Sequence, residues 1–302
     1  MQSPRPSTAS RLDASPHATP GSDGATAINH YENFPVASLL CPAAQRAPIA
    51  AIYHFARTAD DIADEGNASP AQRLAELADY RAQLALCADS TAPLDPRWAG
   101  VFNALGKALR QHALPLQLLH DLLDAFVQDV EKTRDRAGYA NDAELRDYCR
   151  RSANPVGRLL LHLYGVKDAA ALRQSDAICT ALQLINFWQD PSVDIPRGRF
   201  YFTQETQTAN GVQEADLLAL RQTPAITRMV AQCVQDASTT MLQGAPLVHA
   251  VPGRAGWELR LVVQGGLRIL DKIEGMQYAT LKKRPALKKY DYAVMLWRAL
   301  WM

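Results

Sequence analysis

The chain has 302 residues, 48% of them hydrophobic, so it can bury a substantial core as one large domain or as two ordinary ones. Its 32 Lys and Arg residues balance 31 Asp and Glu residues, and the formal net charge of +1 gives no global field that would attract nucleic acid. Any acidic partner must therefore be bound by a local site.

The N-terminal stretch is rich in Ser, Pro, Ala and Thr and lacks the apolar central region of a secretory signal. We expect residues 1–27 to form a disordered leader. No apolar run reaches the length of a membrane span, and the cysteines form neither a CxxC pair nor a Cys/His cluster with zinc spacing. This pattern predicts a cytoplasmic protein with reduced thiols at Cys41, Cys87, Cys149, Cys179 and Cys233.

From about residue 35 onward, apolar residues recur three and four positions apart, which is the helical period. Helix starts are marked by Ser69 with Pro70 and by Pro115, and helix ends by Gly66, Gly138 and Gly165. No linker interrupts this pattern. We therefore predict one all-α domain of about ten helices over residues 28–302, with a central active-site cavity between facing helices.

The stretch "DDIAD" carries the first acidic motif, Asp60, Asp61 and Asp64. On a helix, Asp60 and Asp64 project from nearly the same face, and Asp61 lies about 100° away. Like charges at this spacing repel each other, so a bound cation would stabilise them. A solvated acidic helix end is the alternative interpretation of this motif when it is taken alone.

The second motif lies in "LQLINFWQDPSVDIPRGRFYF", where Gln183, Asn186, Asp190 and Asp194 follow at intervals of three and four. A helix would align these polar groups between apolar side chains. Pro191 would kink this helix, which makes the alignment of Asp194 with Asp190 less secure. A satisfied hydrogen-bond network in the core is the alternative here.

Two inward-facing acidic motifs suit Mg²⁺, a hard cation that binds carboxylates and the oxygens of a diphosphate. They predict a diphosphate site in which metal ions stabilise the departing pyrophosphate and leave a carbocation. Arg57 lies one turn before Asp60, and Arg197 and Arg199 follow Asp194. At these positions they can donate to phosphate oxygens. Aromatic walls for the cation would come from Phe34, Tyr53, Tyr148, Phe187 and Tyr201.

The paired stretches "YHFARTADDIAD" and "NFWQDPSVDIPRGRFY" make the chain similar to the squalene and phytoene synthases, all-helical isoprenoid enzymes, from about His30 to Glu274. The resemblance implies Mg²⁺ ligands, substrate contacts and catalytic groups. The metal ligands would be Asp60, Asp61, Asp64, Asn186, Asp190 and Asp194. Substrate would be bound by His30, Phe34, Tyr53, Arg57, Gln183, Asn186, Arg199 and Tyr201, with catalytic roles for Tyr53, Arg57 and Tyr148.

Within this family, "NHYENFPVAS" and "YCRRSANPVGRLLL" are most similar to bacterial hydroxysqualene synthases of hopanoid pathways. The resemblance implies that presqualene diphosphate ionises, rearranges and is captured by water to give hydroxysqualene and pyrophosphate. Candidates for holding the water are Tyr148, Asn154 and the pyrophosphate. No GxGxxG motif indicates a nicotinamide site.

Two departures from the family favour a single-diphosphate substrate. Enzymes that condense two prenyl diphosphates usually have small hydroxyl residues after the histidine, where this chain has Tyr31, Glu32 and Asn33, and a basic residue in place of Gln189. The runner-up is nevertheless a presqualene diphosphate, dehydrosqualene or phytoene synthase. A non-catalytic helical scaffold is a remote alternative, since both acidic motifs are intact.

The C-terminal stretch "LKKRPALKKYDYAVMLWRALWM" places Lys282, Lys283, Arg284, Lys288 and Lys289 before an apolar end. Either the stretch makes peripheral contact with an anionic membrane, or it is a solvated basic turn followed by a helix docked on the core. The resemblance also implies contacts with the enzymes that act before and after this one in the pathway.

Overall fold

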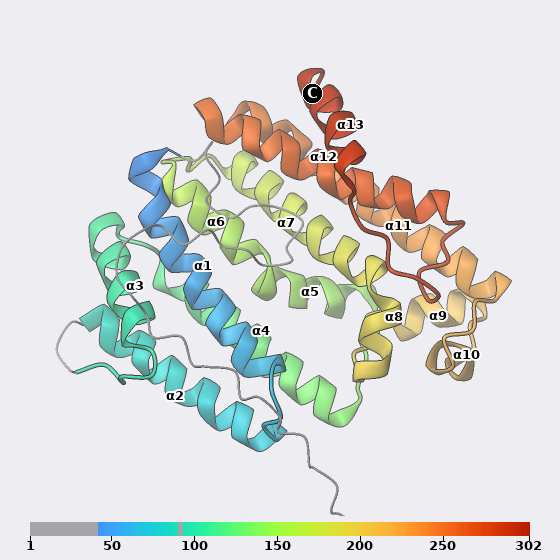
Figure 1. Cartoon of the computed structure of the whole chain (residues 1–302), viewed down its shortest axis with the longest axis horizontal. Helices are drawn as coiled ribbons and strands as arrows, with labels where there is room; N and C mark the ends of the chain where they lie inside the picture. Colours follow the sequence, from blue (N-terminus) through green and yellow to red (C-terminus); the bar gives the residue numbers. More distant parts are fainter. Residues whose placement is uncertain (1–41, 90–92) are drawn as a thin grey trace, which may run out of the picture. The chain divides into compact units, whose positions relative to one another are not determined.

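The computed structural model describes residues 42–89 and 93–302, and every regular element in these ranges is helical (Figure 1). The predicted all-α class is confirmed. The leader and its boundary, together with His30, Phe34 and Cys41, lie outside the described residues. The helices are α1 (Ala43–Asp64), α2 (Pro70–Asp89), α3 (Ala99–His112), α4 (Leu116–Asp135), α5 (Asp142–Ser152), α6 (Asn154–Leu163), α7 (Ala169–Gln189), α8 (Pro191–Asp194), α9 (Gln204–Asn210), α10 (Glu214–Leu218), α11 (Pro224–Gly244), α12 (Gly253–Gly275) and α13 (Lys289–Leu300), with 3-10 turns η1 (Ile195–Arg197) and η2 (Ala245–His249).

Most helix boundaries fall where the sequence signals place them. α2 begins at Pro70, and Pro115 directly precedes α4. Gly66 and Gly165 both follow helix ends with φ of 71°, a left-handed conformation that favours glycine. In the described ranges the structure has more helices than the expected ten, because α8, α9 and α10 are too short for a helical repeat to be seen in the sequence.

α1 is held by an aromatic core that it shares with α2 and α3. Phe55 is fully buried, its ring lies 5.3 Å from the ring of Tyr80, and the Tyr80 hydroxyl donates to the Phe55 carbonyl at 3.1 Å. Trp98 and Phe102 complete this cluster. Because Phe55 fixes the buried face of α1, the acidic residues of the first motif, which lie on other faces of the helix, are also fixed in direction.

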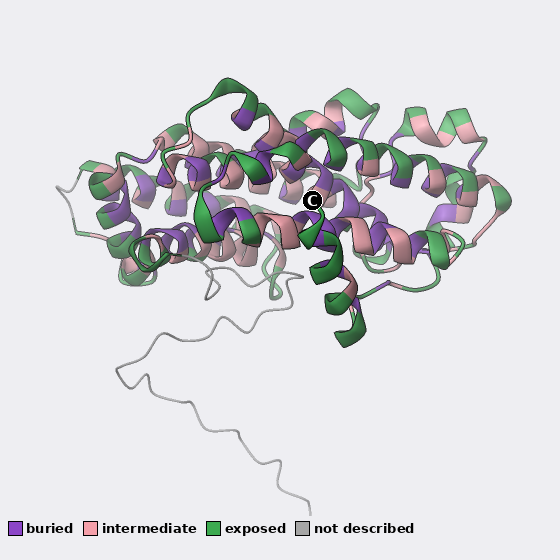
Figure 2. Cartoon of the chain, turned by 90° about the horizontal axis from the view of Figure 1, so that it is seen from above, coloured by how far each residue is buried: buried purple, intermediate pink, exposed green. Residues whose placement is uncertain are grey.

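α7 lies in the second core, between α6 on one side and α11 and α12 on the other (Figure 1). The contact with α11 is close: a Cβ added at Gly244 would lie 2.6 Å from the carbonyl oxygen of Gln174. Buried residues gather between the helices, as Figure 2 shows, and include Leu184, Phe187 and Trp188 of α7. This packing fixes the helix that leads to the second acidic motif.

The kink expected at Pro191 is a complete break. α7 ends at Gln189, and Asp190 has φ −110° and ψ 16°, outside the helical range, before α8 begins. One helix through Asp194 was therefore the wrong expectation, because Pro191 has no amide hydrogen to continue the ladder. The Asp194 amide still donates to the Asp190 carbonyl at 2.9 Å, so the two residues remain one turn apart.

Four cysteines lie in the described ranges, and all four are free thiols, as expected: Cys87, Cys149, Cys179 and Cys233. In the same ranges we find no helix that combines the length and apolar character needed to span a membrane.

α13 packs on α12 through a buried carboxylate. Asp291 is 0% exposed and accepts hydrogen bonds from Arg268 Nε, Lys272 Nζ and the Lys288 amide, each at 2.7 Å. Burial by itself would raise the pKa of Asp291, but these donors outweigh it and lower the pKa to about 2. Because this pKa is lower than in the unfolded chain, the stabilisation is complete above about pH 4 and is lost as the pH falls toward 2.

We expect Asp291→Asn to lower the free energy of unfolding at pH 7 by about 2 kcal/mol, because two cations at the α12–α13 contact lose their partner. The variant should also lose less stability than the unmodified chain between pH 4 and pH 2. Urea unfolding at pH 7 and pH 3 measures both effects. Asp89→Asn, a change at an exposed acid at the end of α2, is the control. Equal losses of unfolding free energy in Asp291→Asn and Asp89→Asn would contradict the stabilising role of the Asp291 carboxylate.

Candidate active site

The first acidic motif is bound to an arginine of its own helix. Arg57 lies 3.0 Å from Asp60 and 2.6 Å from Asp61, through separate guanidinium nitrogens. Burial tends to lower the pKa of Arg57, but the carboxylates of Asp60, Asp61 and Asp64 raise it. Burial raises the pKa of Asp60 to about 7, and the neighbouring Asp64 adds to this effect. The motif therefore concentrates more negative charge than one arginine neutralises.

The second acidic motif is bound to the chain just before α13. Arg284 donates to both carboxylate oxygens of Asp190, with Nη2 at 3.2 Å from Oδ2. Burial, followed by the charge of Asp190, raises the pKa of Asp194 to about 7. Gln189 is fully buried and donates to the Pro285 carbonyl at 2.7 Å, so its amide holds the same C-terminal segment.

Arg199 brings the two motifs together. Its Nη2 donates to Asp64 Oδ2 at 2.8 Å, and its side chain is only 22% exposed. The positive charge of Arg199 also opposes the rise in pKa of both Asp60 and Asp194. The Arg199 backbone amide donates to the Asp194 carbonyl at 3.0 Å, so Arg199 contacts one acid of each motif.

Aromatic rings lie beside the acidic groups. Phe187 and Tyr201 are stacked, with ring centroids 3.7 Å apart and planes 8° apart, and Tyr148 lies 6.2 Å from Phe187. The Tyr148 hydroxyl donates to Asp129 of α4, a short contact. Burial raises the pKa of Asp129 to about 6, and both Tyr148 and Arg199 oppose the rise. The aromatic wall thus has a carboxylate at its edge.

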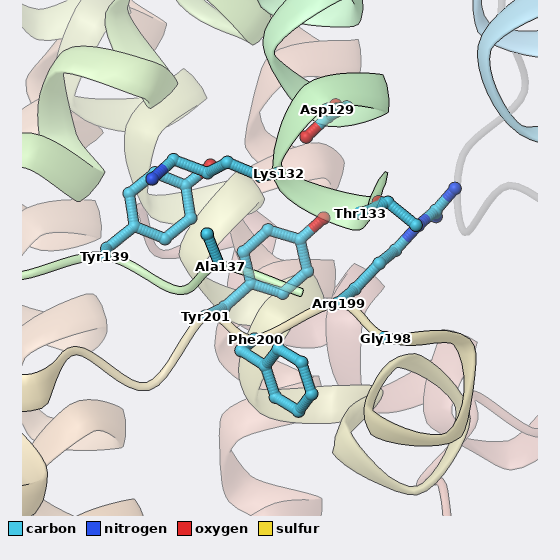
Figure 3. A pocket seen from close by; sticks show the side chains of 9 residues that line it. All are labelled: Asp129, Lys132, Thr133, Ala137, Tyr139, Gly198, Arg199, Phe200 and Tyr201. Atoms are coloured by element: carbon cyan, nitrogen blue, oxygen red, sulfur yellow. The ribbon is translucent and has the colours of Figure 1, made fainter. Parts of the chain in front are cut away.

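A small pocket opens between the end of α4 and the segment after η1 (Figure 3). The hydroxyl of Tyr201 points toward the helix that carries Asp129, and Arg199 reaches past the pocket from the same segment as Tyr201. Lys132 lies over the ring of Tyr139 at 4.4 Å. The pocket is lined by Asp129, Lys132, Thr133, Ala137, Tyr139, Gly198, Arg199, Phe200 and Tyr201.

The donor set of the two motifs fits Mg²⁺ in its chemistry, since it consists of carboxylates and the amide oxygen of Asn186. One of them has an open position: Asp64 Oδ1 is buried and has no hydrogen-bond partner among the described residues. In their present positions, however, no three acidic, His or Cys side chains of the described chain lie close enough to share an ion. Magnesium therefore stays a prediction, and ligation would require the arginines to release carboxylates.

The other predicted site residues are placed differently. Tyr53 is half-buried on α1, with its ring 5.7 Å from that of His54, and Gln183 is half-buried on α7. Asn186 is exposed, and its side chain makes no hydrogen bond with described residues. Asn154 is buried and accepts a hydrogen bond from Thr180 at 3.0 Å, so its amide oxygen is engaged in the core. None of these contacts joins the acidic groups.

Two site residues were not predicted from the sequence, Asp129 and Arg284. Asp129 is one of five acids on the amphipathic helix α4, a pattern that normally indicates a solvated face. Arg284 was grouped with the lysines of the C-terminal basic stretch, but the structure places it on Asp190. No local pattern distinguishes either residue, because each meets its partner only through the tertiary fold.

Comparison with known proteins agrees with this architecture. A crystal structure of squalene synthase HpnC from Alicyclobacillus acidocaldarius superposes with a TM-score of 0.75 at 34% identity, covering 83% of this chain and 91% of that one. The fold is therefore that of the all-α isoprenoid synthases, the class of enzyme that the helices and the paired acidic motifs define. A model of the squalene/phytoene synthase family matches residues 28–291. The chain belongs to the squalene/phytoene synthase family and is a prenyltransferase-like terpenoid synthase.

Two curated relatives carry different names within this family. A hydroxysqualene synthase of Sinorhizobium fredii is 34% identical over 264 residues, 87% of this chain and 84% of the relative. A presqualene diphosphate synthase of Rhodopseudomonas palustris is 30% identical over 238 residues, 79% of this chain and 82% of the relative. The chain is thus similar to proteins named for two different reactions.

Proposed function

We propose that this protein is a hydroxysqualene synthase, which converts presqualene diphosphate and water to hydroxysqualene and pyrophosphate. One observation carries the proposal: Arg199 bonds to Asp64 through its side chain and to Asp194 through its backbone amide, and it is followed by the stacked Tyr201. This arrangement puts anion-binding and cation-stabilising groups next to each other. Bond cleavage between a diphosphate and an allylic or cyclopropylcarbinyl carbon needs both.

In the proposed reaction, Arg57, Arg199 and Arg284 donate to the diphosphate oxygens, since guanidinium groups form charge-assisted bonds with phosphate. To do so they exchange carboxylate partners for the substrate. Mg²⁺ bound by Asp60, Asp64, Asp190 and Asp194 would supply further positive charge for the departing pyrophosphate. The carbon–oxygen bond breaks, its electron pair leaves with pyrophosphate, and a carbocation remains.

Three aromatic side chains stabilise this cation in the proposed reaction. Phe187, Tyr148 and Tyr201 face it with their rings while the cyclopropane rearranges. Tyr148, fixed by its hydrogen bond to Asp129, then positions the attacking water. The water oxygen forms the new carbon–oxygen bond, and its proton passes to Asp129 or to pyrophosphate. The raised pKa of Asp129 suits a group that accepts a proton near neutral pH.

A synthase that condenses two prenyl diphosphates is the second candidate, because a presqualene diphosphate synthase is among the relatives. The position of Gln189 argues against it. A basic residue there would supply a second diphosphate with a cation, whereas the Gln189 amide is buried and bound to the Pro285 carbonyl. The single-diphosphate reaction is therefore favoured.

Product analysis tests the proposal. With presqualene diphosphate and Mg²⁺ in water enriched in oxygen-18, we expect hydroxysqualene that carries the label and equimolar unlabelled pyrophosphate, both identified by mass spectrometry. The label shows that water attacks carbon and not phosphorus. With farnesyl diphosphate alone we expect no C30 product.

Other outcomes would reject this function. Formation of presqualene diphosphate, squalene or dehydrosqualene from farnesyl diphosphate alone, or of phytoene from geranylgeranyl diphosphate, supports the condensing synthase. A folded protein that turns over none of these substrates supports the non-catalytic scaffold.

A further inference from the structure

The C-terminal helix α13 has its charged side turned inward and its aromatic side turned outward. The inner stripe consists of Asp291, Met295 and Ala299, all at most 3% exposed, and Asp291 is held by cations of α12. Arg298 adds an ion pair of 2.7 Å to Asp271. The helix is therefore fixed on α12, and its outer side chains cannot turn into the core.

The outer face is large and apolar. In Figure 2 the helix that ends at the C label extends from its neighbours with most of its surface exposed. We call this surface the α13 face. It consists of Tyr290 (57% exposed), Leu296 (56%), Trp297 (63%), Leu300 (59%) and Trp301 (77%). Such a concentration of exposed tryptophan and leucine is unusual for a solvated surface.

Basic residues flank the α13 face. Lys282, Lys283, Lys288 and Lys289 are exposed, and none of them forms an ion pair with a described residue. Arg284 does not belong to this group, because it is bound to Asp190. The lysines are therefore available to an external anion.

We propose that the α13 face and these four lysines bind the surface of an anionic lipid bilayer. Trp and Tyr rings favour the membrane interface, where an apolar body and a polar edge are both satisfied. Leu296 and Leu300 enter the apolar layer, and the lysines approach the lipid headgroups. Because α13 is already folded and fixed, binding requires no ordering of the chain.

Size and charge favour a bilayer over a second copy of the chain. A helix of 12 residues offers a footprint of about 18 Å by 10 Å. This is roughly 180 Å², well below the approximately 800 Å² per partner of a stable protein interface. A two-fold contact through the α13 face would also bring the two lysine groups together, and like charges repel. An anionic bilayer complements them.

Vesicle co-sedimentation of the full chain tests this surface without any substrate, so its result is independent of the proposed function. We expect binding to vesicles of phosphatidylglycerol and phosphatidylcholine and at least tenfold weaker binding to phosphatidylcholine alone. Trp297→Ala/Trp301→Ala should weaken binding at least tenfold. Lys288→Gln/Lys289→Gln should weaken it about fivefold per lysine on anionic vesicles only.

Matched controls remove similar groups elsewhere. Leu218→Ala/Leu242→Ala shortens two exposed apolar side chains of α10 and α11, and Lys107→Gln/Lys167→Gln removes two exposed lysine charges. Both control proteins should bind vesicles like the unmodified chain. All variants should unfold at the same temperature, and Trp297→Ala/Trp301→Ala should turn over detergent-dispersed substrate normally.

Three results would overturn the proposal. The first is a full chain that does not sediment with anionic vesicles. The second is unchanged sedimentation of Trp297→Ala/Trp301→Ala. The third is a change in molar mass by light scattering in that variant without a change in vesicle binding, which would identify the α13 face as a contact between copies.

Discussion

Replacing Asp190 by Asn is expected to lower kcat/KM for presqualene diphosphate by about two to three orders of magnitude. The amide keeps the size of the side chain but removes a charge from the carboxylate set that would hold Mg²⁺ against the leaving group. Losses of this size are typical when a group that stabilises developing charge is removed. Asp60→Asn should have an effect of the same order. Asp60 belongs to the first acidic motif, and the charge of Arg199 acts on it as well.

Asp190→Asn removes an ion pair with Arg284 as well as a proposed metal ligand, so the two effects must be distinguished. Arg284→Gln breaks the same pair but keeps the Asp190 carboxylate. We expect this variant to need no more Mg²⁺ than the unmodified chain, whereas Asp190→Asn should need much more. Glu65→Gln, at an exposed acid just after α1, is the control for loss of one negative charge. Normal turnover with normal Mg²⁺ dependence in Asp60→Asn or Asp190→Asn would refute the metal assignment.

Replacing Arg199 by Gln is expected to weaken binding of inorganic pyrophosphate by about 10- to 100-fold and to lower turnover in parallel. A charge-assisted hydrogen bond to phosphate contributes on the order of 1.5–3 kcal/mol, which corresponds to this range. Arg199→Lys keeps the charge but not the planar fork, so an intermediate loss is expected. Competitive inhibition by pyrophosphate measures the affinity separately from chemistry.

Loss of Arg199 also leaves Asp64 without its partner, so stability must be measured alongside affinity. Arg158→Gln is the matched control, because Arg158 binds Asp176 through two hydrogen bonds, at 2.8 and 2.6 Å, and Asp176 lies outside both motifs. This control should lose some stability and keep its pyrophosphate affinity. Equal inhibition constants for Arg199→Gln and the unmodified chain would exclude Arg199 from the diphosphate site.

The sequence alone was sufficient for the features that depend on local periodicity and local chemistry. Apolar spacing predicted the all-α class, and proline and glycine marked most helix ends, because these residues act on the backbone of their own turn. The spacing of Asp60 and Asp64 placed them on one face of α1. Pro191 was identified as a weak point, although the helix breaks there completely.

The tertiary structure decided which distant residues meet. Only the fold brings Arg199 to Asp64, 135 positions earlier, and Arg284 to Asp190, 94 positions earlier. Asp129 reaches Tyr148 in the same way, although nothing in its own helix marks it. These partners are brought together by the packing of the helices, and the energy of an ion pair depends on distance in space and not on distance in sequence. The direction of α13 was likewise fixed by a buried carboxylate, since the apolar pattern of its sequence fits a helix turned either inward or outward.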